Sequence, residues 1–337
     1  MDIPAILTLD PSQLIAGPVG PQGEQGIQGP QGQQGEQGPA GPAGSGSVQG
    51  VVSLITYLDA RHGAGNWTQR TGVGQGTDIG PALGDALDDL RATYGRGSVV
   101  IPPGTWLMTA PPSAAQYSGN FIDGLGSQAS KIVFNAAAGS PFSFSGAGGY
   151  TGGGVRGIGL LLEDGYPSST AQMIRLAGDA TYQPDQMEFR DLYMSALGNS
   201  YWYDGLYAFG NARTSPQGIR VMDFSNVQVF RCRNTGVYLS NVVQCAMRNI
   251  GVYAGQGTGN NFYITGGGAA LSNSNQIHID GLAVAGELNM TNCTRWHVSG
   301  SVGSVGAAAS ANYGDLCVVK SGTFGGAFGA NTRIVML

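Results

Sequence analysis

The chain has 337 residues, of which 58 are glycine and 11% are charged, and its formal net charge is −5. No basic run that would neutralise phosphates occurs in the sequence, so nucleic-acid binding is disfavoured. No apolar run approaches the roughly 20 residues that a membrane-spanning helix needs.

The chain begins with a short segment, residues 1–16, that is both apolar and acidic. It carries Asp2 and Asp10 and no Lys or Arg, whereas a secretory signal needs a positive region there. We therefore expect the protein to be made and assembled in a cytoplasm. Pro4 and Pro11 disfavour a long helix, and a short head of this kind is suited to docking on a partner.

A collagen-type Gly-X-Y tract follows over residues 17–44. Its glycines keep strict three-residue spacing, at Gly17, Gly20, Gly23, Gly26, Gly29, Gly32, Gly35, Gly38, Gly41 and Gly44. Three chains wind together only if every third residue is glycine, because nothing larger fits at the shared axis. The tract predicts a homotrimer with a rod of roughly 80 Å. The alternative is a flexible linker with accidental periodicity. Proline occurs at X positions and never at Y, where animal collagens carry hydroxyproline. The tract therefore does not depend on proline hydroxylation, which indicates a bacterial or phage origin.

A linker is expected over 45–56, and the β-branched and aromatic run from Val51 to Leu58 is typical of a strand. An amphipathic helix is expected next, with Pro81 in its first turn. A short strand over 99–101 and a Pro-Pro-Gly turn follow the helix. The apolar residues that share one helical face are Leu83, Ala86, Leu87 and Leu90.

This order of elements, over residues 57–108, resembles the entry module of pectate-lyase-like right-handed parallel β-helices. The segment from Asp59 to Ala64 resembles the strand and Gly-Ala turn that precede the helix in that family, and the Gly-rich insertion before Thr77 departs from the pattern. The resemblance implies an all-β, pectin-lyase-like fold over residues 109–337, with a capping α-helix that covers the open end of the first coil.

A repeating pattern beyond the module supports a solenoid. The order apolar, any, small or Asx, apolar, any, apolar begins at Val155, Phe189, Phe224, Met247 and Ile279, with irregular spacing. A β-helix keeps its strands while its loops vary in length. The third positions accept positive φ at a bend and are predicted to form a column; they are Gly157, Asp191, Asn226, Asn249 and Gly281. A β-sandwich of many short strands is the competing fold.

A collagen-like stalk joined to such a β-helix resembles the trimeric tailspikes and tail fibres of bacteriophages. The resemblance implies a location in the virion tail, a head that docks on a tail or baseplate protein, and a distal domain that binds or degrades host surface polysaccharide. Three hypotheses follow. The protein is a structural virion protein that attaches to host glycan, a polysaccharide depolymerase of the glycosidase or lyase type, or an adaptor fibre that carries another tail protein.

The strongest candidate site is an aromatic segment, in which five aromatic residues fall within residues 201–209. Aromatic faces pack on the apolar faces of sugar rings, and nearby polar groups hydrogen-bond hydroxyls. A subunit interface is the alternative, because Tyr and Trp are also common in buried contacts. The predicted glycan-binding residues are Tyr201, Trp202, Tyr203, Tyr207 and Arg213.

Glycoside hydrolysis would require a pair of carboxyl groups. Asp204 has the most suitable surroundings, because aromatic neighbours raise the pKa of a carboxyl group. Glu163 and Asp164 are weaker candidates, since their setting before Gly165 is typical of a solvated loop.

No cofactor or metal site is expected. Cysteines at 232, 245, 293 and 317 lack CxxC spacing and are interpreted as buried free thiols, and the three histidines lie far apart in the sequence.

Overall fold

In the computed structural model the chain divides into two compact units, Met1–Gly46 and Ser47–Leu337. The structure describes residues 50–117, 119–145, 152–178, 184–210, 219–253, 262–265, 274–291, 293–308, 313–318 and 331–336. The predicted docking head, the collagen-type tract and Arg213 lie outside the described residues.

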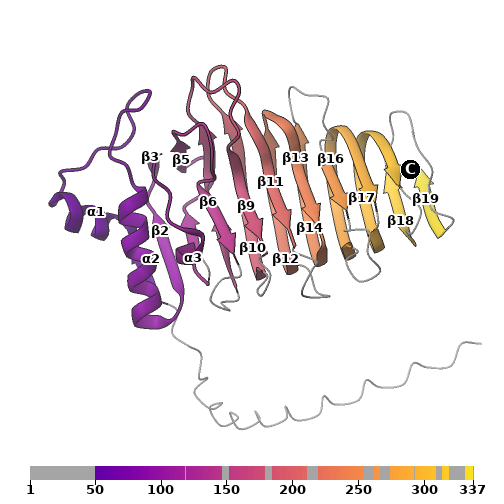
Figure 1. Ribbon diagram of the computed structural model, residues 1–337, viewed down its shortest axis with the longest axis horizontal. Coiled ribbons are helices and arrows are strands. Elements are labelled where there is room, and N and C mark those ends of the chain that lie inside the picture. The colour runs from indigo at the N-terminus through magenta and orange to yellow at the C-terminus, as the bar shows by residue number, and fades with distance from the viewer. Residues whose placement is uncertain are drawn as a thin grey trace, which may run out of the picture. The chain divides into compact units, whose positions relative to one another are not determined.

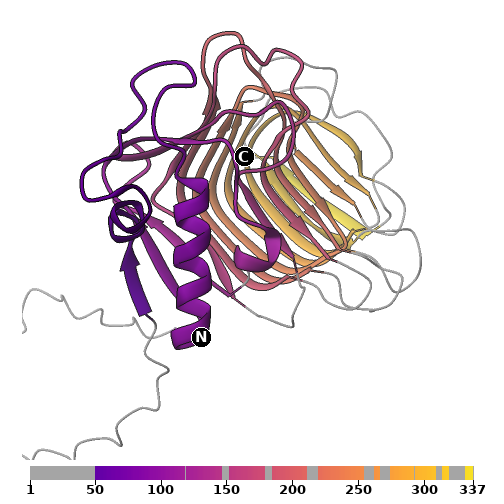
Figure 2. The same cartoon turned by 60° about the vertical axis from the view of Figure 1, so that its left-hand side comes forward.

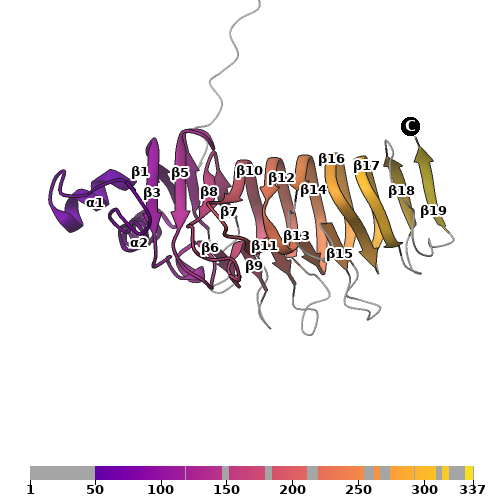
Figure 3. The ribbon, with the colours of Figure 1, turned by 90° about the horizontal axis from the view of Figure 1, so that it is seen from above.

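The second unit is built from strands that stack in parallel, coil upon coil. Each pair of named strands is parallel, and strands from successive coils stay in register over long stretches, as between β12 (Ile219–Phe230) and β14 (Val242–Tyr253). Figures 1 and 3 show the strands following one another along this unit in chain order. This is a parallel β-helix, and the competing β-sandwich is wrong, because a sandwich of that kind pairs its strands antiparallel.

The coils place their strands in three rows. The first row begins with β1 (Gly50–Ser53), β2 (Gly97–Ile101), β4 (Phe121–Gly124) and β7 (Gly153–Arg156), and the second with β3 (Gly104–Met108), β5 (Ser130–Phe134) and β8 (Gly159–Leu162). From β10 (Asp185–Ala196) onward one long bent strand in each coil serves both rows, as in β12, β14, β16 (Ser274–Thr291) and β17 (Cys293–Ala308). The ends of β16 and β17 also continue the third row, and the short strands β18 (Tyr313–Val318) and β19 (Asn331–Met336) continue the first. The third row contains β6 (Phe142–Ser145), β9 (Gln172–Ala177), β11 (Trp202–Phe209), β13 (Cys232–Ser240) and β15 (Phe262–Thr265).

The bend between the first two rows confirms the predicted column. Gly157, Asp191, Asn226, Asn249 and Gly281 all have positive φ, between 54° and 70°. The Asn226 amide donates a 2.8 Å hydrogen bond to the Asp191 carboxylate, and the Asn249 amide donates one of 2.8 Å to the Asn226 oxygen. Short polar side chains therefore allow the left-handed backbone and also link the coils to one another.

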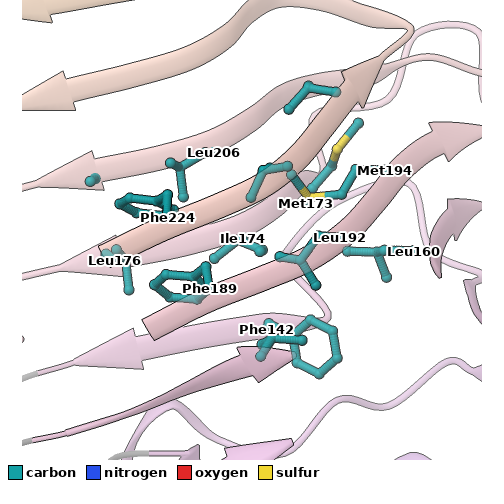
Figure 4. Close-up of a cluster of buried hydrophobic side chains, with 14 of the residues drawn as sticks. Phe142, Leu160, Met173, Ile174, Leu176, Phe189, Leu192, Met194, Leu206 and Phe224 are labelled. Atoms are coloured by element: carbon teal, nitrogen blue, oxygen red, sulfur yellow. The ribbon is translucent and has the colours of Figure 1, made fainter. Parts of the chain in front are cut away.

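The interior is filled by apolar columns. In Figure 4, Phe142, Ile174 and Leu206 from the third row point into the same space as Phe189 and Leu192 from β10. The Phe189 and Phe224 rings stack at 4.9 Å between centroids. Each fully buried side chain of this size contributes about 1.5–3 kcal/mol. The columns therefore hold the coils in register however long the connecting loops are.

Helix α2 (Gly80–Tyr94) covers the N-terminal end of the stack, as the sequence predicts. Its apolar face is fully buried against the first coil, and Pro81 lies in its first turn. Figure 2 shows the helix in front of the strand stack. The Asp78 carboxylate accepts hydrogen bonds from the backbone amides of Gly80, Thr109 and Ala110, so one side chain joins the helix start to the end of β3.

The structure corrects the strand expected over 51–58 and the strand and turn expected over 59–64. Only Gly50–Ser53 is extended, and α1 (Leu54–His62) follows. Ser53 caps the helix by accepting a hydrogen bond from the Ile55 amide, while Leu54 and Leu58, one helical turn apart, are both buried. The short helix α3 (Ala114–Tyr117) packs near β6. In the described part of the chain no helix is long and apolar enough to cross a membrane.

Candidate functional site

Three tyrosines form a row on the outer side of the third strand row. Tyr207 of β11 pairs with Tyr238 of β13, which pairs with Tyr263 of β15. The Tyr207 and Tyr238 ring centroids lie 5.0 Å apart with planes 8° apart, and those of Tyr238 and Tyr263 lie 5.4 Å apart at 21°. Both faces of Tyr238 are therefore covered by its neighbours. We call these three residues the tyrosine row.

A pocket of about 460 Å³ lies beside the tyrosine row. Besides the row it is lined by Gln172, Tyr203, Asp204, Asn234 and Thr235. Burial raises the pKa of the Tyr207 and Tyr238 hydroxyls, which therefore remain protonated at neutral pH. The pocket thus combines aromatic rings with phenol, amide and carboxylate groups.

Asp204 holds the floor of this pocket together. Its side chain accepts hydrogen bonds from the Gln172 amide at 2.9 Å, from the Asn234 amide at 2.8 Å and from the Thr235 backbone amide at 3.2 Å. The residue is only 1% exposed. One carboxylate therefore ties together three successive coils, those of β9, β11 and β13.

The pKa of Asp204 is raised, as its aromatic neighbours in the sequence predict. Burial is the main cause, and the hydrogen bonds from Gln172, Asn234 and Thr235 oppose it. The carboxyl oxygens are already occupied by three donors, so Asp204 is better arranged to support the pocket than to exchange a proton with a ligand.

The aromatic segment is divided by the alternation of strand β11. Trp202 is fully buried, its ring stacks on Phe134 at 5.9 Å, and its indole nitrogen donates to the Ser195 carbonyl. The structure therefore corrects the expectation that Trp202 contacts a glycan. Tyr203 faces the pocket, and the guanidinium of Arg233 lies 5.6 Å from its ring centroid.

Tyr201 lies just outside the pocket lining. The guanidinium of Arg231 is 4.9 Å from its ring centroid, in a cation–π contact. Of the predicted glycan-binding residues, the structure thus brings Tyr203 and Tyr207 together in the pocket and places Tyr201 beside Arg231.

Glu163 has a structural role that the sequence did not suggest. Its side chain is fully buried and forms a two-point ion pair with Arg70, with Nε–Oε2 at 2.8 Å and Nη2–Oε1 at 2.5 Å. This contradicts the interpretation of a solvated loop carboxylate. The neighbouring Asp164 accepts hydrogen bonds from the Gly165 and Asn199 amides and so joins two adjacent turns. Neither residue lines the Asp204 pocket.

Tyr238, Tyr263, Gln172 and Asn234 belong to the site and were missed in the sequence. They come from coils before and after β11, and coil-to-coil register depends on loop lengths that carry no pattern. The available signal was the recurrence of an aromatic residue between apolar residues, as in Val237-Tyr238-Leu239 and Phe262-Tyr263-Ile264.

Of the cysteines expected to be buried thiols, Cys232, Cys245 and Cys293 are buried, and no disulfide joins them to one another. Burial raises the pKa of the Cys232 and Cys245 thiols. Among the described residues no three His, Cys, Asp or Glu side chains are grouped so that they could hold a metal ion.

Comparison with solved structures finds weak similarities. The A-module of the mannuronan C-5 epimerase AlgE6 of Azotobacter vinelandii is 13% identical, with a TM-score of 0.48 over 77% of this chain and 94% of that one. The AlgE4 A-module of the same organism is also 13% identical, with a TM-score of 0.44 over 79% and 76%. ORF18 of Geobacillus virus E2 is 13% identical, with a TM-score of 0.37 over 84% and 59%. No protein-family model and no curated protein matches the chain.

Proposed function

We propose that the protein is the subunit of a trimeric bacteriophage tail fibre or tailspike that binds a host surface glycan along the tyrosine row. The tyrosine row and its polar pocket are the observation that carries the binding role. The collagen-type spacing in the sequence supports three chains per particle. A right-handed, pectin-lyase-like winding of the coils and a triple-helical stalk belong to the same proposal.

The chemistry of the pocket suits a saccharide. Because the rings of the tyrosine row stack on one another, the row offers ring edges and phenol hydroxyls at the spacing of the coils, about 5 Å. The half-buried amides of Gln172 and Asn234 lie next to it. A polysaccharide that runs along the coils would present hydroxyl groups to these donors and acceptors, while Tyr203 offers an apolar surface.

Residues 1–16 are the proposed docking segment for a virion tail or baseplate protein, and the virion tail is the proposed location of the protein. The third hypothesis, an adaptor that carries another tail protein, predicts that a second fibre protein copurifies with this one.

Binding is better supported than cleavage. Glycoside hydrolysis requires two carboxyl groups about 5–10 Å apart. Asp204 is the one carboxyl group among the described residues that line the pocket, and its oxygens already accept three hydrogen bonds. Incubation of the protein with a bound polysaccharide should therefore release no new reducing ends and no unsaturated products; release of either supports the depolymerase hypothesis.

The test is binding of the full-length protein to an array of bacterial surface polysaccharides. A variant with Tyr207→Ser, Tyr238→Ser and Tyr263→Ser should lose at least tenfold in affinity for its glycan. The matched control is a second aromatic row, on the β10, β12 and β14 side. Its ring centroids lie 5.3 and 4.9 Å apart, and the control variant carries Tyr193→Ser, Phe230→Ser and Tyr253→Ser.

The control variant should keep its affinity. If the wild-type protein binds no glycan, or if both variants lose affinity equally, the proposed site is wrong. If the tyrosine-row variant instead changes the particle mass in light scattering, the row is a subunit interface, which is the alternative expected for an aromatic cluster.

A further inference from the structure

Four arginines of the first strand row whose side chains the structure describes are neutralised by neighbouring carboxylates. Arg156 pairs with Asp123 at 2.7 Å, Arg190 with Glu188 at 2.6 Å, Arg220 with Asp185 at 3.1 Å and Arg248 with Asp223 at 2.8 Å. Each partner comes from the same strand or from a coil next to it. This side of the β-helix therefore presents balanced charge.

The side that carries the tyrosine row is different. Arg175 of β9 is exposed and pairs with Tyr207 in the strand register, so it occupies the next position in line with the tyrosine row. Arg231 and Arg233 lie over the Tyr201 and Tyr203 rings.

The described hydrogen-bond partners of Arg231 and Arg233 are neutral. The Arg231 guanidinium donates to the carbonyls of Ala196 and Gly198, and that of Arg233 donates to the carbonyl of Ser169. None of Arg175, Arg231 and Arg233 forms an ion pair with a described carboxylate, in contrast to the arginines of the first strand row.

Two described carboxylates lie near the tyrosine row, and each of them already accepts hydrogen bonds from neutral donors. Asp204 is buried beneath the row and receives three hydrogen bonds. Glu287 accepts a hydrogen bond from Asn289, which is paired with Tyr263 at the far end of the row. Among the described residues, Arg175 is thus an exposed cation in line with the tyrosine row for which no carboxylate partner is found.

We propose that the glycan bound along the tyrosine row is acidic, with a carboxylate that pairs with the Arg175 guanidinium beside Tyr207. This inference depends on the proposed glycan-binding function and specifies its ligand class. A guanidinium and a carboxylate match in a planar, two-point geometry, and a charge-assisted hydrogen bond is stronger than a neutral one. The neutral part of the saccharide would then lie over Tyr203 and the tyrosine row.

The experiment measures the affinity of the full-length protein for uronic-acid polysaccharides, for the same polymers after reduction of their carboxyl groups, for neutral polysaccharides and for sulfated dextran. Arg175→Gln removes the proposed contact. Arg248→Gln, on the first strand row, removes one charge from an exposed position and is the matched control. We expect binding to a uronic-acid polymer that falls about tenfold with Arg175→Gln, weakens with added salt and is unchanged by Arg248→Gln.

Three results would overturn this assignment: equal affinity for the acidic and the carboxyl-reduced polymer, equal effects of the two substitutions, or equally tight binding of sulfated dextran. In the first two cases loss of affinity in the tyrosine-row variant would still support the proposed function. If neither the acidic nor the neutral polysaccharides bind, the proposed function itself fails.

Discussion

The buried ion pair between Arg70 and Glu163 allows a quantitative prediction. Arg70 lies in the Gly-rich insertion that departs from the expected entry module, and Glu163 follows β8 two coils further on. The carboxylate also accepts hydrogen bonds from the Gly74 and Asp164 amides. Substitution Glu163→Gln keeps the size of the side chain and removes its charge. The Gly-rich insertion, residues 65–76, should then open more often from the rest of the β-helix.

The size of the effect follows from burial. The Glu163 side chain is 0% exposed and that of Arg70 is 16% exposed. Removing one partner of a buried pair costs about 3–5 kcal/mol. Because Arg70 keeps some contact with water, we take the lower end, about 3 kcal/mol. At 1.4 kcal/mol for each factor of ten, local opening of the insertion should become about 100-fold more frequent.

Hydrogen exchange measures this opening directly. The Arg70 amide donates to the Thr105 carbonyl and the Thr77 amide donates to the Thr68 carbonyl, so both amides report on the insertion. Their protection should fall about 100-fold in Glu163→Gln, while amides of the distant strands stay protected. Asp85→Asn is the control, because the Arg61–Asp85 pair is exposed and worth at most about 1 kcal/mol.

The pH dependence gives an independent check. Burial acts to raise the pKa of Glu163, but the hydrogen bonds from Arg70, Asp164 and Gly74 and the Arg70 charge outweigh it and hold the pKa below its ordinary value of 4.5. A lowered pKa means that the stabilisation is present above about pH 4.5 and is lost as the pH falls below it. Acid should open the insertion in the wild type more than in Glu163→Gln. Equal protection in the two proteins at neutral pH would refute the reasoning.

Three further predictions concern stability and reactivity. Asp204→Asn keeps an acceptor for the Thr235 amide and should cost about 1 kcal/mol in denaturant unfolding, against about 3 kcal/mol for Asp204→Ala, which strands three donors. Because the pKa of Asp204 is raised, its contribution to stability should decline as the pH rises through that pKa, and this slope should vanish in Asp204→Asn. Asn226→Ala should lower stability by about 1–2 kcal/mol, since φ is 54° there, and Asn226→Gly should cost less. Cys232 and Cys245 should react with a thiol reagent only on unfolding; rapid labelling of the native protein would contradict their burial.

Local rules explain which parts of the fold were predictable. Asn226 and Gly281 occupy positions where the backbone itself demands positive φ, so the residue type at the bend reports the conformation directly. The buried face of α2 was predictable for the same reason, because Leu83 and Leu87 lie one helical turn apart in the sequence and are both buried. Helix α1 was missed because Val51 and its neighbours have strand-like composition, while the Leu54 and Leu58 spacing that indicates a helix is only one turn long.

The candidate site depends on contacts that composition does not encode. Trp202 and Tyr203 are adjacent and both aromatic, yet strand alternation buries the first and turns the second to the pocket. A period of two separates this pair, but over residues 202–209 it would also place Asp204 in the core, although Asp204 lines the pocket. No such rule places Tyr238 and Tyr263 beside Tyr207, because the loops between coils differ in length. The Arg70–Glu163 pair is equally non-local.

Because the proposed binding residues lie outside the core, the effect of a substitution on binding can be measured separately from its effect on folding. Inward residues such as Leu206 and Val237 stack in the core, and their substitution would disturb every coil. Arg175 lies outside the core, and no described carboxylate forms an ion pair with it. A change at Arg175 should therefore alter affinity and leave the unfolding midpoint unchanged. If Arg248→Gln instead lowered both the affinity for the glycan and the unfolding midpoint, charge on this solenoid would act on binding through the stability of the fold.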